Sequence, residues 1–178
     1  MQIPDVQIKN ILYATDLSES AQYAFSYAIS LASQYGAKIT FLHVLADMPS
    51  IVDSSGAMGY IGEQRWQELQ NKHQQDAKDA LIGKRRDHHL IRDILDQFSE
   101  KVKNDFEKRD DNDDEIVVEK GNSVEKILAV ASEKNCDLIV MGTHGRSKLA
   151  DVVMGSTARR VIRRSELPVL VVRKTESK

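Results

Sequence analysis

The stretch from Asp137 to Thr157 constrains the fold of this chain more than any other. It begins with a short aliphatic run, Leu138 to Met141, of the kind that forms a strand buried on both faces. The run ends abruptly at Gly142, and two more glycines follow before a new helical pattern opens at Ser156. A buried strand, a glycine loop and a helix in this order predict one unit of a parallel α/β sheet.

The glycine loop has the properties of an anion-binding site. Glycine adopts positive φ and lets a ligand approach the bare backbone, and a cap at Ser156 or Thr157 would leave free N–H groups at the helix start. Such donors, together with the positive end of a helix dipole, suit a phosphate group. The alternative interpretation is a glycine-rich turn that caps a helix and binds nothing.

The spacing of the glycines excludes two common kinds of phosphate-binding loop. Gly142-x-x-Gly145 is followed by nine residues and then by Gly155-Ser156. A Walker A loop needs Gly-Lys-Ser/Thr and the dinucleotide fingerprint needs Gly-x-Gly-x-x-Gly, so the loop is neither of these. It resembles the nucleotide loop of the universal stress protein family, in its ATP-binding branch.

This resemblance extends over most of the chain. Besides the glycine loop, it includes Asn10 to Ser18, Ile39 to Leu45 and Leu167 to Val172. One departure is Ala14, because many family members carry proline before the Thr-Asp pair. A larger departure is the long segment between about Asp47 and Asp114.

Strands and helices alternate along the rest of the chain, and Gly36 is expected to end the first helix. Candidate helix caps are Ser18 or Ser20 near the start and Asn122 with Glu125 further on. The expected strands are Ile8 to Ala14, Lys38 to Leu45, Ile116 to Val118, Leu138 to Met141 and Val169 to Val172. The pattern predicts an α/β fold, an open five-stranded parallel sheet with helices on both faces and a ligand crevice at its carboxyl edge.

The resemblance implies a Rossmann-like, adenine nucleotide alpha hydrolase-like form of this fold, with ATP as the ligand and Mg²⁺ arriving with the triphosphate. Asp16, at the carboxyl end of the first strand, would either cap its own loop or bond the ribose or adenine side of the nucleotide. The nucleotide-binding residues that the resemblance and the loop chemistry indicate are Ala14, Thr15, Asp16, Val44, Met141, Gly142, His144, Gly145, Arg146, Gly155, Ser156 and Thr157.

Three functions stay open at this point. The first is an ATP-binding stress-response or regulatory protein that acts through nucleotide-dependent conformation or partner binding. The second is a slow ATPase, for which His144, Arg146 and Lys148 lack a matching carboxylate partner. The third is a nucleotide-free dimerisation module that acts on a protein partner through its middle segment.

The middle segment, about 47–114, is expected to be a partly flexible helical excursion, a lid or a partner surface. Pro49 to Gly62 is rich in glycine and serine, whereas Glu63 to about Gln75 has a helical pattern with Trp66 and Leu69 on its inner side. A second helical pattern runs from about His88 to Phe106, with Leu90, Ile91, Ile94, Leu95, Phe98 and Val102 on one face.

Length and charge limit the remaining possibilities. With 178 residues we expect one domain, residues 1–178, and a net charge of −2 gives no electrostatic footprint for nucleic acid or an anionic membrane. Residues 1–9 lack an apolar signal region, so the expected location is the cytoplasm. The single cysteine, Cys136, is expected to be a packed, inert thiol.

Two features lie near the end of the chain. Arg159, Arg160, Arg163 and Arg164 are expected to face outward or to gather at the helix end, where cations complement the dipole. The aliphatic strand Val169 to Val172 comes last and is expected to join a homodimer if it lies at a sheet edge. The family that the chain resembles commonly dimerises through this strand. The alternative is an ordinary core strand.

Overall fold

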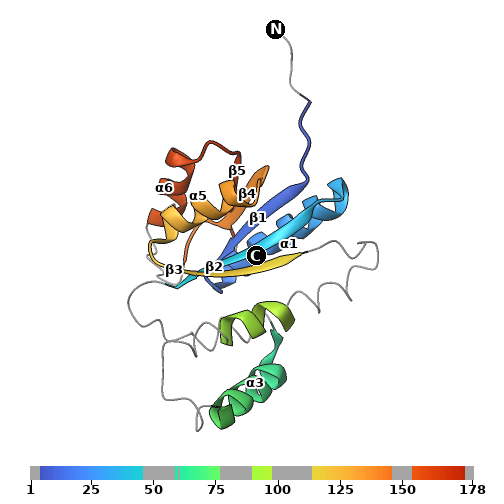
Figure 1. Ribbon diagram of the computed structural model, residues 1–178, viewed down its shortest axis with the longest axis vertical. Helices are drawn as coiled ribbons and strands as arrows, with labels where there is room; N and C mark the ends of the chain where they lie inside the picture. The colour runs from blue at the N-terminus through green and yellow to red at the C-terminus, as the bar shows by residue number, and fades with distance from the viewer. Residues whose placement is uncertain are drawn as a thin grey trace.

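The computed structural model describes residues 5–45, 59, 61–76, 90–97, 114–145 and 154–174. Its centre is a five-stranded parallel sheet in the order β3-β2-β1-β4-β5 (Figure 1). The strands are β1 (Asn10–Thr15), β2 (Lys38–Leu45), β3 (Glu115–Lys120), β4 (Leu138–Gly142) and β5 (Val169–Val172). The predicted α/β fold with a parallel open sheet is confirmed.

Helices pack on both faces of the sheet because alternate residues of each strand point to opposite sides. Ile11 and Tyr13 of β1 belong to one buried cluster, which includes the apolar face of α1 (Glu19–Tyr35). Leu12 and Ala14 belong to the other cluster, which includes α5 (Ser123–Glu133) and α6 (Ser156–Arg164). A strand buried on both faces explains why β1 and β4 have continuous apolar sequences.

The predicted residues begin and end α1 and begin α5. The Ser18 hydroxyl accepts a hydrogen bond from the Ala21 N–H at 3.2 Å, and Gly36 ends α1 in the left-handed conformation with φ of 65°. The Asn122 side chain accepts from the N–H groups of Val124 and Glu125 and caps α5. Ser18 and Asn122 thus satisfy donors that the first turn of a helix leaves free.

The middle segment contributes α3 (Glu63–Asp76) and a helix at residues 90–97. Trp66 and Leu69 are buried as predicted, and so are Ile91, Ile94 and Leu95, all in the cluster that contains α1. Leu90 is partly buried against the same cluster. Phe98, Val102 and residues 49–58 lie outside the described residues, so the lid interpretation stays a prediction.

The two edges of the sheet differ in chemistry. Along β3, Glu115 and Glu119 form ion pairs with Lys134 and Lys126 of the neighbouring α5 region. At the opposite edge, β5 is wholly aliphatic and mostly half-buried. The premise of the dimer prediction, an edge position for β5, is therefore confirmed. Within the described helices, none has the length and apolar character required to cross a membrane.

Cys136 is buried, and we expect its thiol to be inert in the folded protein. Burial, helped by the negative charge of Asp137, raises the pKa of Cys136 from 9.0 to about 11. Because the thiolate is the reactive form, about a hundredfold less of it is present at pH 8 than for an unshifted thiol. A chromogenic disulfide reagent at pH 8 should label the native protein slowly and the urea-unfolded protein at once. Equal rates in both states would contradict this prediction.

Candidate functional site

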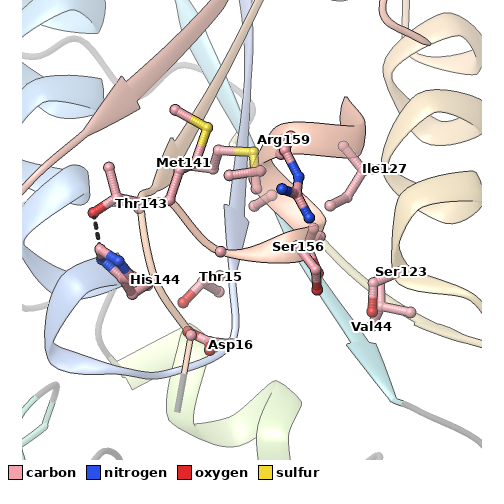
Figure 2. A pocket seen from close by; sticks show the side chains of 18 of the residues that line it. Thr15, Asp16, Val44, Ser123, Ile127, Met141, Thr143, His144, Ser156 and Arg159 are labelled. Atoms are coloured by element: carbon pink, nitrogen blue, oxygen red, sulfur yellow. Dashed lines mark hydrogen bonds between the residues drawn. The ribbon is translucent and has the colours of Figure 1, made fainter. Parts of the chain in front are cut away.

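A pocket of about 400 Å³ opens at the carboxyl ends of β1 and β4 (Figure 2). The chain leaves β1 toward β2 on one side, whereas β4 pairs with β1 on the other side. The loops after β1 and β4 therefore diverge from neighbouring strands, which leaves a crevice between them. This is the crevice that the strand pattern predicts.

The pocket gathers nearly all of the predicted site residues. Arg146 is the exception, since it lies outside the described residues. The predicted residues that line the pocket are Ala14, Thr15, Asp16, Val44, Met141, Gly142, His144, Gly145, Gly155, Ser156 and Thr157. The structure brings these residues together, and their role in binding stays a prediction.

The loop after β1 is held in place by its own polar side chains. The Thr15 hydroxyl accepts from the Leu17 N–H at 3.1 Å, and Asp16 Oδ1 accepts from the Ser18 N–H at 3.0 Å. Leu17 is buried with a positive φ of 63°, a conformation that a leucine keeps only when its surroundings impose it. Asp16 thus caps its loop and also lines the pocket, and its bond to a nucleotide stays a prediction.

His43 fixes the end of β1 from the neighbouring strand. The residue is 3% exposed, and Nδ1 lies 2.9 Å from the carbonyl oxygen of Thr15. Because that partner can only accept, Nδ1 carries the proton and donates it. The carbonyl group just before Asp16 is therefore held by β2, which limits the movement of the Asp16 loop.

At both described ends of the glycine loop, the backbone lies close to neighbouring groups. The Gly155 N–H donates to the Thr143 carbonyl at 2.7 Å, which joins the two ends of the loop. A Cβ atom on Gly145 would lie 2.6 Å from Asp16 Oδ2, and one on Gly155 would lie 3.0 Å from the Thr143 carbonyl oxygen. The backbone at these glycines thus approaches neighbouring groups more closely than a side chain would allow.

The start of α6 differs from the prediction. The N-cap is Gly155, with no hydrogen bond from a side chain, and neither Ser156 nor Thr157 is the cap. The first turn also has no acidic residue, whereas α1 has a Ser18 cap with Glu19 and α5 has an Asn122 cap with Glu125. An uncapped helix start with its positive dipole end at a pocket wall suits an anion.

The prediction missed several lining residues. Some form an apolar wall, and others add polar groups at the starts of α5 and α6. They are Ala21, Leu42, Ser123, Ile127, Thr143, Met154, Ala158 and Arg159. Thr143, inside the Gly142–Gly145 loop, had a signal in the sequence. Leu42 reaches the pocket from β2, next to Ala14, whereas Ser123 and Ile127 reach it only through the packing of α5 on the sheet. Arg159 is exposed as predicted, yet it also lines the pocket.

The pocket is divided by chemistry. One side is apolar and is formed by Leu42, Val44, Ile127 and Met141. The other side is polar and combines the Asp16 carboxylate, the hydroxyl groups of Thr143 and Ser156, and the start of α6. His144 Nδ1 lies 2.9 Å from Thr143 Oγ1. Among the described residues, no three His, Cys, Asp or Glu side chains converge to hold a metal ion.

Comparison with known proteins gives a consistent result. Residues 7–173 match the profile described as Universal stress protein family. Universal stress protein MJ0577 of Methanocaldococcus jannaschii is 30% identical over 97% of this chain and 99% of its own length. Universal stress protein YxiE of Bacillus subtilis is 28% identical over 92% of this chain and 97% of its own length.

Solved structures agree with the fold. The MJ0577 structure superposes with a TM-score of 0.59 at 27% identity, covering 97% of this chain and 100% of that one. UspA of Lactobacillus plantarum gives a TM-score of 0.58 at 24% identity over 95% of this chain and 100% of that one. A universal stress protein in complex with cAMP gives 0.56 at 20% identity over 95% of this chain and 99% of that one. The last two likenesses concern the fold.

Proposed function

The chain belongs to the universal stress protein family, and from this premise we propose that it binds ATP in the pocket above β1 and β4. Mg²⁺ would enter with the triphosphate, since hard oxygen ligands on the phosphates suit it. The protein would then act as a stress-response or regulatory protein whose conformation or partner binding depends on the nucleotide.

The start of α6 is the observation that carries this proposal. It faces the pocket without a side-chain cap or an acidic first turn, and its N-cap, Gly155, has no side chain to cover it. Free backbone N–H groups at a helix start bind phosphate oxygens, and the helix dipole adds to the attraction. We place the phosphates there, with Gly142, Gly145, Ser156 and Thr157 around them.

The rest of the pocket suits a nucleoside. Its volume of about 400 Å³ lies in the usual range for small-molecule sites. An adenine ring would lie against Leu42, Val44 and Ile127, with backbone groups of Val44 at its edge. Asp16 would accept hydrogen bonds from the ribose, because its carboxylate faces the pocket from a loop that Thr15 and Ser18 hold in place.

The pocket suits ATP binding better than rapid ATP hydrolysis. Efficient hydrolysis requires an oriented base beside the attacking water. Asp16 is the only carboxylate among the described lining residues, and it already accepts a hydrogen bond from the Ser18 N–H. Slow hydrolysis remains the alternative, and a phosphate-release assay would distinguish it from binding.

Mg-ATP is expected to stabilise the wild-type protein, and Gly145→Val should remove this effect. A ligand at about 100 times its dissociation constant adds about 2.7 kcal/mol to the free energy of unfolding. A valine at 145 would meet the Asp16 carboxylate and fill the space beside it. Thermal melts with and without Mg-ATP measure the shift for each protein.

The matched control is Tyr35→Val, which places the same side chain at an exposed position of α1 and should keep the full ATP shift. Mass spectrometry of the supernatant after denaturation would also identify nucleotide carried through purification. A wild-type melt that ATP leaves unchanged would contradict the nucleotide site itself.

We also propose a homodimer through β5. The carbonyl groups of Pro168 and Val172 accept hydrogen bonds from β4 and from Thr143 just after it. The alternate residues Val169 and Val171 therefore direct their N–H and C=O groups away from the sheet. A second copy of β5, related by a two-fold axis, would pair with these groups in an antiparallel sense. Its aliphatic side chains would cover the half-buried ones of the first copy.

A further inference from the structure

Arg159 is the cation that the pocket places beside its anion-binding end. It follows Ser156 by one helical turn on α6, and both residues line the pocket. Figure 2 shows its guanidinium group extending from α6 toward Ser156, on the side where Ile127 lies. The neighbouring Arg160 is exposed and does not line the pocket, so the two arginines differ in position and not in chemistry.

Arg159 lies at an electrostatically unfavourable place for a cation. A cation near a helix start meets the positive end of the dipole, and the first turn of α6 contains no acidic residue to offset it. Among the described residues, no carboxylate lies within ion-pair distance of Arg159, whereas Lys126, Lys134 and Lys174 each have a glutamate partner. An anion in the pocket would compensate both charges at once.

We propose that Arg159 contacts the outer phosphates of the nucleotide and gives the pocket its preference for a linear triphosphate over AMP and cyclic AMP. This inference rests on the proposed nucleotide site. The first turn of α6 can bind one phosphate group through its backbone. A guanidinium one turn further along the helix adds a planar, bidentate donor for a second group. A cyclic monophosphate carries a single negative charge and has no outer phosphate to reach it.

Titration calorimetry with ATP, AMP, cyclic AMP and adenosine tests the inference on the wild type, Arg159→Gln and Arg160→Gln. Arg159→Gln should lower the affinity for ATP by about tenfold and that for AMP and cyclic AMP by less than about threefold. Adenosine should bind the wild type and Arg159→Gln with equal affinity. Arg160→Gln removes the same charge from the same helix outside the pocket, so its four affinities should match the wild type.

Arg159→Lys gives a second readout. It keeps the charge but loses the bidentate fork, so it should recover only part of the ATP affinity. The salt dependence of ATP binding should also be weaker in Arg159→Gln than in the wild type, because one ionic contact is missing. Since Arg159 is exposed, neither substitution threatens the core.

The outcomes separate the two proposals. Equal losses for ATP and adenosine in Arg159→Gln would mean that the guanidinium stacks on the base, and would overturn the inference while leaving the nucleotide site intact. Unchanged ATP affinity in Arg159→Gln, or the same loss in Arg160→Gln, would also overturn it. A wild-type protein that binds none of the four ligands would overturn the proposed function and this inference with it.

Discussion

Replacing Gly142 with alanine is expected to lower the free energy of unfolding by about 3 kcal/mol, the upper range for an overpacked core. The added Cβ would lie 2.7 Å from Ser20 Oγ, 2.9 Å from the Ser20 carbonyl carbon and 3.0 Å from its oxygen. Two of these atoms are backbone of the first turns of α1 and cannot rotate aside. Urea denaturation followed by circular dichroism would measure the loss.

Ser20→Ala is the matched control for this effect. The Ser20 hydroxyl is buried without a hydrogen-bond partner among the described residues, so its removal should leave stability unchanged or slightly raised. In the double variant the cost of Gly142→Ala should fall only in part, because the backbone atoms of Ser20 remain. A Gly142→Ala protein as stable as the wild type would show that α1 can shift away from β4.

The second large effect is a change from dimer to monomer, measured as molecular mass. We expect the wild type to be a dimer, and Val171→Pro to be a folded monomer, because proline removes an N–H group that points away from β4. Val171→Thr keeps the amide, the branched shape and nearly the volume, and should remain dimeric. Light scattering gives the mass, and circular dichroism checks that each variant is folded.

Two results would contradict the interface. A wild-type chain that is monomeric at high micromolar concentration would reject the dimer outright. A Val171→Pro protein that stays dimeric would place the contact elsewhere on the surface. If Val171→Pro unfolds, Val169→Lys provides a second test, because its charge would enter the same edge from a half-buried position.

All five strands could be predicted from the sequence, but β1 and β3 begin and end at other residues than predicted. The ends of two strands were predicted because strong local signals bound them. Lys38–Leu45 follows the helix-ending Gly36, and Val169–Val172 follows Pro168, and both observed strands have the predicted ends. At the start of α6 the prediction failed: serine and threonine are good caps, yet Gly155 takes that role. The bond from its N–H to the Thr143 carbonyl fixes the entry of the chain, and no local pattern encodes that contact.

The site was predicted only in part, because sheet topology can be inferred from the sequence and helix packing cannot. Asp16 follows β1 directly and Gly142 ends β4, so topology alone brings these two residues to one edge of the sheet. Ile127 and Arg159 enter the pocket from helices whose orientation depends on how α5 and α6 pack together. Helical periodicity separates a buried face from an exposed one. It does not identify the exposed arginine that borders a pocket.

The ion pairs along β3 have a consequence for assembly. A sheet that offered open aliphatic strands at both edges would add copies without limit and grow into a filament. In a dimer joined through β5, the two outer edges are both β3, where Glu115 and Glu119 are paired with lysines of α5 and its end. A third copy would have to bury these charges to pair with either edge, at a high cost in desolvation. In such a dimer the charged strand would therefore act as a terminator of polymer growth and would limit the number of subunits to two.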